Sequence, residues 1–446
     1  MLEGALGIET LSLLFFLTLL ALIMIGVPVA FTLGGTAVVF GYLFWGPASL
    51  HMFTSNAFGT MQNIVLVAIP LFLFMGALLQ YLGVGEDLYR AAHRTLGRVA
   101  GGLAIGTVAI CAVFAAMVGA SAPATVSMGM TALPSMLKRN YSHEIAIGSI
   151  GGGGALGVLI PPSIPMILYA LITGTSVGKL FLGGILPGLL LVGLFSTYIA
   201  ARCSLDKRLG PPIDAASLEA EFESAKAQGY SRANTLMPIV LILCMFVAMY
   251  SGIATPTEAA AGGAIGAIII GIINRRQSFS LMKKAGLDTA GLTAMIMWVV
   301  LGGVWLSSVY QGIGASQLVA SFFQNLEVGP WGTIVIMQVT WILLGCLLDP
   351  TAIMFMTMPL FFPLIVELGF DPVWFGILFI INMEMSYLTP PFGLNLFYLK
   401  AVVPEGITIG QVTKACVPFL LLQALALVIV MLFPQIIMWL PNLVIG

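Results

Sequence analysis

The strings Leu159-Ile160-Pro161-Pro162-Ser163 and Leu388-Thr389-Pro390-Pro391-Phe392 decide the fold, because each interrupts an apolar run of membrane-crossing length. A membrane helix needs about 20 apolar residues. Proline lacks an amide donor and its ring clashes with an earlier carbonyl, so a proline pair unwinds the helix and frees backbone oxygens. Free carbonyls at membrane depth are costly unless they line a cavity or hold a cation. We therefore expect two broken membrane helices, with plain kinks as the alternative.

The composition around these strings is that of a membrane protein with many spans. Of the 446 residues, 59% are hydrophobic and 8% are charged, whereas a soluble domain has about 25% charged residues. This composition excludes a soluble enzyme. The net charge of -1 comes without a basic block, so nucleic acid is not an expected partner. The five cysteines are scattered, without metal-binding spacing, and are expected to be small core residues.

Apolar runs predict ten full spans and two interrupted stretches. The expected spans lie near residues 8–30, 31–50, 63–82, 144–174, 180–201, 235–252, 256–273, 289–311, 372–400 and 412–433. The stretches 100–137 and 330–367 are each 38 residues long and carry a break in the middle, at Gly119–Pro123 and at Asp349–Thr351. Each forms either two crossing helices or a re-entrant hairpin whose tip stops part-way through the bilayer.

The basic residues orient the chain, because Lys and Arg stay on the cytoplasmic side of short loops. With the N-terminus outside and both interrupted stretches returning to their starting side, sixteen of the seventeen Lys and Arg residues fall inside and only Lys179 falls outside. No basic residue precedes Arg90, so the first apolar run lacks the basic region of a signal peptide and is expected to stay as a span.

A single offset of 229 residues aligns the chain with itself. It places the first Pro-Pro pair on the second, Tyr81 on Tyr310, and Pro134 on Pro363. An odd number of expected crossings separates the copies, so they face opposite ways. Inverted repeats are typical of secondary transporters, whose binding site lies near the midplane where broken helices meet. The alternative is a duplicated membrane scaffold.

Polar groups near the breaks indicate what the site binds. Ser121 and Thr125 at the first tip, Thr351 at the second tip and Asn395 after the second break are the candidate substrate ligands. The half-helices that begin after the tips direct a partial positive charge toward one centre, which suits a carboxylate. The unwound carbonyls suit Na⁺. Asn395 either reaches this site or bonds a neighbouring helix.

Two acidic residues in apolar surroundings have two interpretations each. Asp349 either tunes a sodium site or caps the half-helix that follows it. Glu384 lies within a span before the second break, where an ionisable group is a functional candidate by default, or it is a protonated structural donor.

Five longer strings carry a family resemblance: Ile69–Gly76, Gly157–Ile164, Leu344–Pro350, Asp371–Gly376 and Leu388–Phe397. With them the chain resembles, over nearly its whole length, the large membrane subunit (M subunit, DctM type) of tripartite ATP-independent periplasmic (TRAP) transporters. The resemblance implies an all-α polytopic membrane protein with inverted repeats, each holding a re-entrant helical hairpin and a Pro-Pro-broken helix, divided into elevator-type scaffold and transport domains. One departure lies at the first tip, where the family's common Ser-Gly-Ser-Ser reads Val118-Gly119-Ala120-Ser121, so two hydroxyls are missing.

The resemblance also implies a function and partners. It predicts sodium-coupled import of a small organic acid, delivered by a periplasmic substrate-binding protein (P type), together with a small four-helix membrane subunit (Q type) expected to be a separate chain. The expected location of the protein is the bacterial inner membrane, where it contacts membrane lipid and both chain termini are periplasmic. Two or more Na⁺ are the implied coupling ions. Their implied ligands are backbone oxygens near Ser121, Gly157, Ile160 and Pro162, and near Gly345, Ser386, Thr389 and Phe392.

The expected organisation has four segments. Residues 1–99 are scaffold helices and a first arm, and 100–201 are the first half of the transport domain; residues 202–329 are a cytoplasmic loop, scaffold helices and a second arm, and 330–446 are the second half of the transport domain. A stand-alone Na⁺/organic-anion symporter without a binding protein is the alternative function. An intramembrane enzyme is not expected, because no HExxH motif, Ser/His pairing or intramembrane Asp pair occurs.

Overall fold

The computed structural model describes residues 7–214 and 232–445, and every regular element in these two ranges is a helix. The elements are α1 (Ile8–Met24), α2 (Val29–Trp45), α3 (Ala48–Met61), η1 (Ile64–Val67), α4 (Ala68–Tyr81), α5 (Val84–Leu96), α6 (Gly102–Val118), α7 (Ser121–Lys138), α8 (His143–Ala155), η2 (Leu156–Val158), α9 (Ile164–Thr173), α10 (Val177–Leu205), α12 (Arg232–Tyr250), α13 (Pro256–Ile273), α14 (Phe279–Gly312), α15 (Ala315–Asn325), α16 (Gly329–Gly345), α17 (Pro350–Glu367), α18 (Pro372–Ser386), α19 (Leu394–Val402), α20 (Ile409–Leu432) and α21 (Gln435–Val444).

The helices form a membrane bundle that exposes many large apolar side chains on its outer surface. Seven helices within the described residues are long and apolar enough to cross a membrane unaided. Large apolar side chains such as Leu17, Val247 and Leu421 are exposed at half or more of their surface. Such a surface is stable in lipid, where the helix satisfies its own backbone hydrogen bonds. The polytopic all-α class expected from composition is therefore confirmed.

The internal repeat is visible in the helix boundaries. Adding 229 to Ser121, the first residue of α7, gives Pro350, the first residue of α17; the same shift takes His143 at the start of α8 to Pro372 at the start of α18. The match also extends toward the N-terminus, where α1 and α2 correspond to α12 and α13. The repeat therefore includes the helices that are expected to form the scaffold as well as the hairpins and broken helices.

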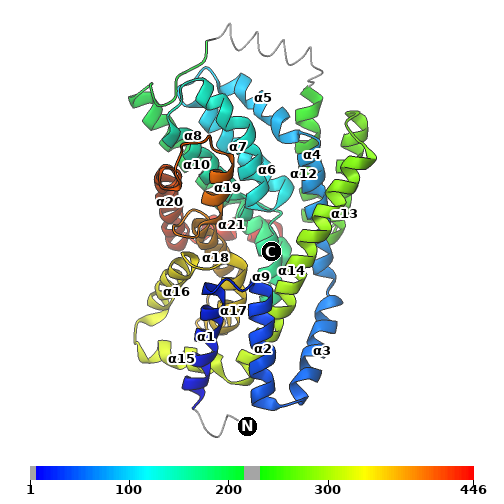
Figure 1. Cartoon of the computed structure of the whole chain (residues 1–446), viewed down its shortest axis with the longest axis vertical. Coiled ribbons are helices and arrows are strands. Elements are labelled where there is room, and N and C mark those ends of the chain that lie inside the picture. Colours follow the sequence, from blue (N-terminus) through cyan, green and yellow to red (C-terminus); the bar gives the residue numbers. More distant parts are fainter. Residues whose placement is uncertain (1–6, 215–231, 446) are drawn as a thin grey trace.

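The two copies point in opposite directions. The amphipathic helices α5 and α15 occupy equivalent places in the two copies and lie near opposite ends of the long axis (Figure 1). The hairpin α6–α7 likewise lies in the half that carries α5, and the hairpin α16–α17 lies in the other half (Figure 1). The arm α15 meets α16 at a bend of 120°. This arrangement is the inverted repeat that the offset predicted.

Two unexpected helices and one shifted helix boundary depart from the sequence-based expectation. Helix α3 was not expected, α14 begins ten residues before the predicted 289, and α21 follows the last predicted span. The polar residues of α3 hid its helical pattern. In the first copy, α3 and α4 are separate because the Asn63 side chain accepts a hydrogen bond from the Val65 amide at 3.0 Å and caps the short helix η1. The equivalent position in the second copy is Leu292, which cannot cap, and α14 runs through it.

Close glycine contacts join the outer helices to the inner ones. A Cβ atom on Gly76 of α4 would lie 2.8 Å from the Cα of Val118 at the first hairpin tip. A Cβ atom on Gly303 of α14 would lie 2.0 Å from the Phe355 ring of α17. Smooth surfaces of this kind allow close packing without interlocking side chains. The domain boundaries at 99/100, 201/202 and 329/330 stay a prediction.

Candidate substrate and cation site at the broken helices

The first break is an unwound segment and not a plain kink. Helix α8 ends at Ala155, and the chain passes through η2 and the proline pair before α9 begins at Ile164. Ser163 caps the new helix by accepting a hydrogen bond from the Met166 amide at 3.4 Å, while its hydroxyl donates to the Val158 carbonyl at 2.5 Å. Both proline pairs contain a cis peptide bond. The Ser163 side chain therefore bonds one backbone group before the proline pair and one after it.

The first hairpin tip is packed directly against this break. Gly119 has a left-handed backbone (φ +67°), and a Cβ there would lie 2.5 Å from the carbonyl oxygen of Pro162. The Gly119 carbonyl accepts a hydrogen bond from the Ile164 amide at 3.3 Å. A Cβ on Gly157 would lie 2.5 Å from the carbonyl oxygen of Ala120. Because the break lies mid-span, a tip that contacts it stops part-way through the bilayer, as expected for a re-entrant hairpin.

Four carbonyls at this contact, in residues that are buried or half-buried, have no hydrogen-bond donor among the described residues. No donor in residues 7–214 or 232–445 bonds to the carbonyl oxygens of Ala120, Gly157, Ile160 or Pro162. Three of these residues are among those singled out from sequence. Buried carbonyls are normally paired, and an orphaned polar group in an apolar interior is costly. Carbonyl oxygens in this condition have the chemistry of ligands for a hard monovalent cation.

The second break is more open and more fully hydrogen-bonded. Thr389 donates from its hydroxyl to the Met385 carbonyl at 2.8 Å, and its own carbonyl accepts from the Gly393 amide at 2.9 Å. A Cβ on Gly345, at the end of α16, would lie 2.0 Å from the hydroxyl of Ser386. Phe392 is 51% exposed. The structure therefore brings Gly345 and Ser386 together and leaves Phe392 at an accessible edge of the break.

Asn395 connects the two copies at the centre. It lies in the first turn of α19, is fully buried, and accepts a hydrogen bond from the Ser121 hydroxyl at 2.7 Å. Its amide nitrogen donates to the Gly151 carbonyl of α8 at 3.5 Å. The Ser121 hydroxyl has one proton, so it shares its donation between Asn395 and the Gly154 carbonyl at 2.9 Å. Asn395 both reaches the first hairpin tip and bonds a neighbouring helix, so its two interpretations coincide.

The other two candidate ligands lie one at each hairpin tip. Thr125 is fully buried, and its hydroxyl donates to the Ser121 carbonyl at 3.1 Å. Thr351 lies at the second tip, where its amide donates to the Asp349 carboxylate at 2.9 Å, and the Ala352 amide donates to the same oxygen at 3.4 Å. Asp349 is thus the N-cap of α17, which is one of its two interpretations.

The whole-chain comparison decides the family. A sequence model of the family described as "Tripartite ATP-independent periplasmic transporter, DctM component" matches residues 16–436. The chain belongs to this DctM family. The C4-dicarboxylate TRAP transporter large permease protein DctM of Pseudomonas aeruginosa is 35% identical over 90% of this chain and 91% of its own length. The isethionate TRAP transporter permease protein DctMQ of Oleidesulfovibrio alaskensis is 29% identical over 93% of this chain and 64% of its own length.

A solved structure shares the fold. The Alcanivorax borkumensis YdaH transporter, described as having an unusual topology, superposes with a TM-score of 0.64 over 96% of this chain and 99% of that chain, at 15% identity. The likeness therefore concerns the arrangement of helices alone. The expected family and fold class are both confirmed, and the relatives are transporter permeases.

In the DctM fold Glu384 lies in the last turn of α18, just before the second break, and contacts α20. Glu384 is fully buried and accepts a hydrogen bond from the Gln423 side-chain amide at 2.9 Å. Its second carboxylate oxygen and the Gln423 amide oxygen have no partner among the described residues. A proton on Glu384 donated to Gln423 would satisfy both oxygens, which is the structural-donor interpretation.

The sequence analysis missed the small residues that make these contacts possible. Ala120, Gly151 and Gly154 contribute carbonyls or close approach to the centre of the DctM subunit. A Cβ on Gly154 would lie 2.0 Å from the Thr125 hydroxyl oxygen. The signal was present, because residues 151–154 are four consecutive glycines inside an apolar span. Such a run is unfavourable for a helix unless other backbone segments approach it closely.

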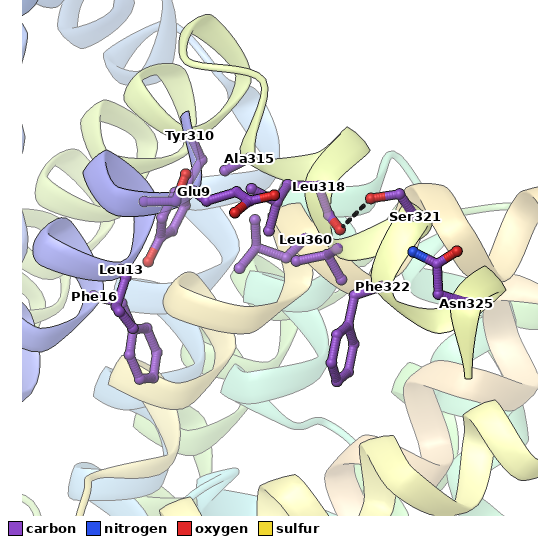
Figure 2. A pocket seen from close by; sticks show the side chains of 12 residues that line it. Glu9, Leu13, Phe16, Tyr310, Ala315, Leu318, Ser321, Phe322, Asn325 and Leu360 are labelled. Atoms are coloured by element: carbon purple, nitrogen blue, oxygen red, sulfur yellow. Dashed lines mark hydrogen bonds between the residues drawn. The ribbon is translucent and has the colours of Figure 1, made fainter. Parts of the chain in front are cut away.

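One further cavity, of about 520 Å³, lies beside α1, α15 and α17 (Figure 2). Leu13, Phe16, Phe322 and Leu360 give it an apolar lining, and Glu9 extends into it from α1 toward α15 (Figure 2). None of its lining residues belongs to a break or a hairpin tip. It is therefore separate from the candidate substrate and cation site.

Proposed function

We propose that this DctM subunit imports a small organic acid together with Na⁺, and that C4-dicarboxylates are the first substrates to test. The observation that carries the proposal is the set of carbonyls at the first break that lack donors among the described residues, those of the buried Gly157 and Pro162 and of the half-buried Ala120 and Ile160. Sodium is a hard cation suited to oxygen ligands. The substrate class follows from the P. aeruginosa relative, whose name states C4-dicarboxylate transport.

Helix ends around the same centre support an anionic substrate. Helix α7 begins at Ser121 with no side-chain cap, and the amides of Ser121 and Ala122 in its first turn have no acceptor among the described residues. Such amides are available to an anion and carry a partial positive charge. Helix α19 also begins without a side-chain cap, but its Asn395 and Leu396 amides already donate to backbone carbonyls. Ser121, Thr125, Thr351 and Asn395 remain the proposed substrate ligands. Gly345, Ser386, Thr389 and Phe392 remain the proposed second sodium set.

The charge balance gives the expected energetics. Each Na⁺ that enters down an inside-negative potential contributes about 2.3 kcal/mol per 100 mV, and each negative charge on the acid costs the same amount. Two Na⁺ offset a dicarboxylate dianion, and a third makes the cycle electrogenic. Two ions with a monoanion are already electrogenic. Membrane-potential dependence of uptake therefore measures the number of ions once the substrate charge is known.

An elevator movement and partner proteins complete the proposal. The smooth contacts at Gly76 and Gly303 would let the transport helices slide past the scaffold while carrying both breaks. A separate small membrane subunit and a periplasmic binding protein are proposed partners. The name DctMQ of the O. alaskensis relative, which is longer than this chain, supports the small subunit. The proposed place is the bacterial inner membrane, with periplasmic termini.

Reconstituted uptake tests the proposal. Proteoliposomes that hold this chain with its small subunit, supplied with the binding protein and a labelled C4-dicarboxylate, should take up substrate only when an inward Na⁺ gradient is imposed. Replacing Pro390 and Pro391 by alanine should let the helix rewind and abolish sodium-driven uptake. The matched control is Pro418→Ala, which removes a proline inside α20 away from the breaks.

Two outcomes would contradict the proposal. Uptake by this chain alone, without binding protein or small subunit, would favour the stand-alone symporter. Unchanged sodium dependence in the double alanine variant, with normal membrane insertion, would remove the second break from the mechanism.

A further inference from the structure

A second cavity, polar on one side, lies between the proposed scaffold helices and the proposed transport helices. It has a volume of about 380 Å³ and is lined by α3 and α14 on one side and by α9 and α17 on the other. Its scaffold side presents hydroxyl and amide groups, those of Ser55, Asn56, Thr60, Ser307, Ser308 and Gln311. We call this set the polar vestibule. Its lining residues carry no formal charge.

The polar vestibule is held in shape by its own hydrogen bonds and keeps free donors. The Asn56 side-chain amide donates to the Ser308 hydroxyl at 2.7 Å, which fixes α3 against α14. The Gln311 amide donates to the Ser307 hydroxyl at 3.4 Å. Among the described residues, no acceptor takes the hydroxyl protons of Ser55 or Ser307. These two protons remain available to a ligand in the cavity.

The inverted repeat shows that the fold does not require this polarity. Subtracting 229 from Ser307, Ser308 and Gln311 gives Leu78, Leu79 and Leu82, all three of which are buried. The same backbone positions are therefore stable with leucine in the first copy. Polar side chains in a membrane interior are expensive and mark substrate pathways by default. The polarity of the second copy calls for a functional explanation.

The position of the cavity relative to the breaks supplies that explanation. Phe355 lines the cavity and lies five residues into α17 from Pro350 at the second tip, which is about 8 Å along the helix at 1.5 Å per residue. Leu171 lines it seven residues into α9 from the first break, or about 10 Å. A slide of the transport helices by about this distance, toward the end of the molecule where α15 lies, would bring the breaks level with the polar vestibule.

We infer that the polar vestibule is the scaffold half of the outward-facing substrate path. The free hydroxyl protons of Ser55 and Ser307, and the amide protons of Asn56 and Gln311 that no acceptor among the described residues takes, donate hydrogen bonds to the carboxylate of the organic acid as the acid passes from the binding protein to the broken helices. Neutral donors suit this task, because binding on a path must be strong enough to admit the anion and weak enough to release it. The inference rests on the proposed function and adds residues from the scaffold to it.

Leucine variants that reproduce the residues of the first copy test the inference. In the reconstituted complex, Ser307→Leu and Ser308→Leu should lower the initial rate of sodium-driven uptake at least tenfold. The acid should still stabilise the detergent-solubilised complex against thermal unfolding when Na⁺ is present. The acid concentration that gives half of this stabilisation should stay within twofold of the wild-type value, because the broken helices are intact. The matched control is Thr54→Leu, an exposed threonine of α3 outside the cavity. Wild-type uptake by both serine variants would overturn the inference.

A labelling experiment separates this inference from the proposed function. Ser55→Cys should react with a membrane-impermeant anionic thiosulfonate added from the periplasmic side, with wild type as the background for the five native cysteines. Saturating C4-dicarboxylate should slow the reaction several-fold. If the wild-type complex shows no sodium-driven uptake, the proposed function fails and this experiment still decides the vestibule. Protection by the acid supports it, and an unchanged labelling rate overturns it.

Discussion

Replacing Gly157 by alanine is the sharpest test of the cation site, because the new methyl group would meet backbone and not a flexible side chain. The Cβ would lie 2.5 Å from the Ala120 carbonyl oxygen, 2.8 Å from its carbonyl carbon and 3.0 Å from the Ser121 Cα. Ordinary contacts begin at 3.4 Å, so the hairpin tip must retreat from the break by roughly the 0.9 Å difference between 3.4 and 2.5 Å. At least one carbonyl oxygen would then be too far from the Na⁺ to bind it.

The expected size of the effect follows from the value of one such contact. Interactions of a backbone group with a charged partner contribute about 1.5–3 kcal/mol, and about 1.4 kcal/mol corresponds to a factor of ten in affinity. Gly157→Ala should therefore raise the half-maximal Na⁺ concentration for uptake by about 10- to 100-fold. The measurement is initial uptake in proteoliposomes as a function of Na⁺, supported by Na⁺-dependent thermal stabilisation of the purified protein.

The control for this variant lies in α10. A Cβ added to Gly193 would meet no atom within 4 Å, so Gly193→Ala should leave the sodium dependence unchanged and stabilise the helix by up to about 1 kcal/mol. A folded Gly157→Ala protein with wild-type sodium dependence would refute the assignment of the first break as a cation site.

Three further predictions each address a single contact. Asn395→Leu removes the buried hydrogen bond from the Ser121 hydroxyl, whose loss costs about 1–3 kcal/mol, so the rate of uptake should fall about tenfold. Adding Ser121→Ala to this variant should lower the rate much less than Ser121→Ala does alone. Fully additive effects of the two substitutions would contradict the coupling. Asp349→Ala should lower the stability by about 1 kcal/mol through loss of the cap, while Asp349→Asn keeps both stability and the half-maximal Na⁺ concentration; a sodium defect in the asparagine variant would show that the carboxylate binds the ion. Asp87→Asn breaks the 2.6 Å ion pair between the 2% exposed Asp87 and the 33% exposed Arg276. Thermal unfolding should show that the free energy of unfolding falls by about 3 kcal/mol, the low end for a buried pair, because Arg276 is partly solvated. A fall of less than about 1 kcal/mol would mean that this pair does not hold the arm α5.

Sequence reasoning found the elements of the site but not their partners. Proline chemistry alone predicted both breaks, and the shared offset predicted the inversion that α5 and α15 display at opposite ends (Figure 1). The hydrogen bond from Ser121 to Asn395 spans 274 residues, and no local pattern indicates such a pairing. The donor-free carbonyl of Ala120 was missed for the same reason, because backbone oxygens have no sequence signature.

The amino-acid sequence by itself determined that this chain crosses a membrane many times, repeats itself in opposite orientations and interrupts one helix in each copy. These properties follow from hydrophobicity and from proline's missing amide, which act within one turn of the chain. Only the tertiary structure decided which oxygens stay unpaired, which glycines allow the tip to touch the break, and that the serines and the glutamine in place of leucines along α14 line a cavity. Those features depend on distances between segments far apart in the chain, which packing sets and local propensity does not.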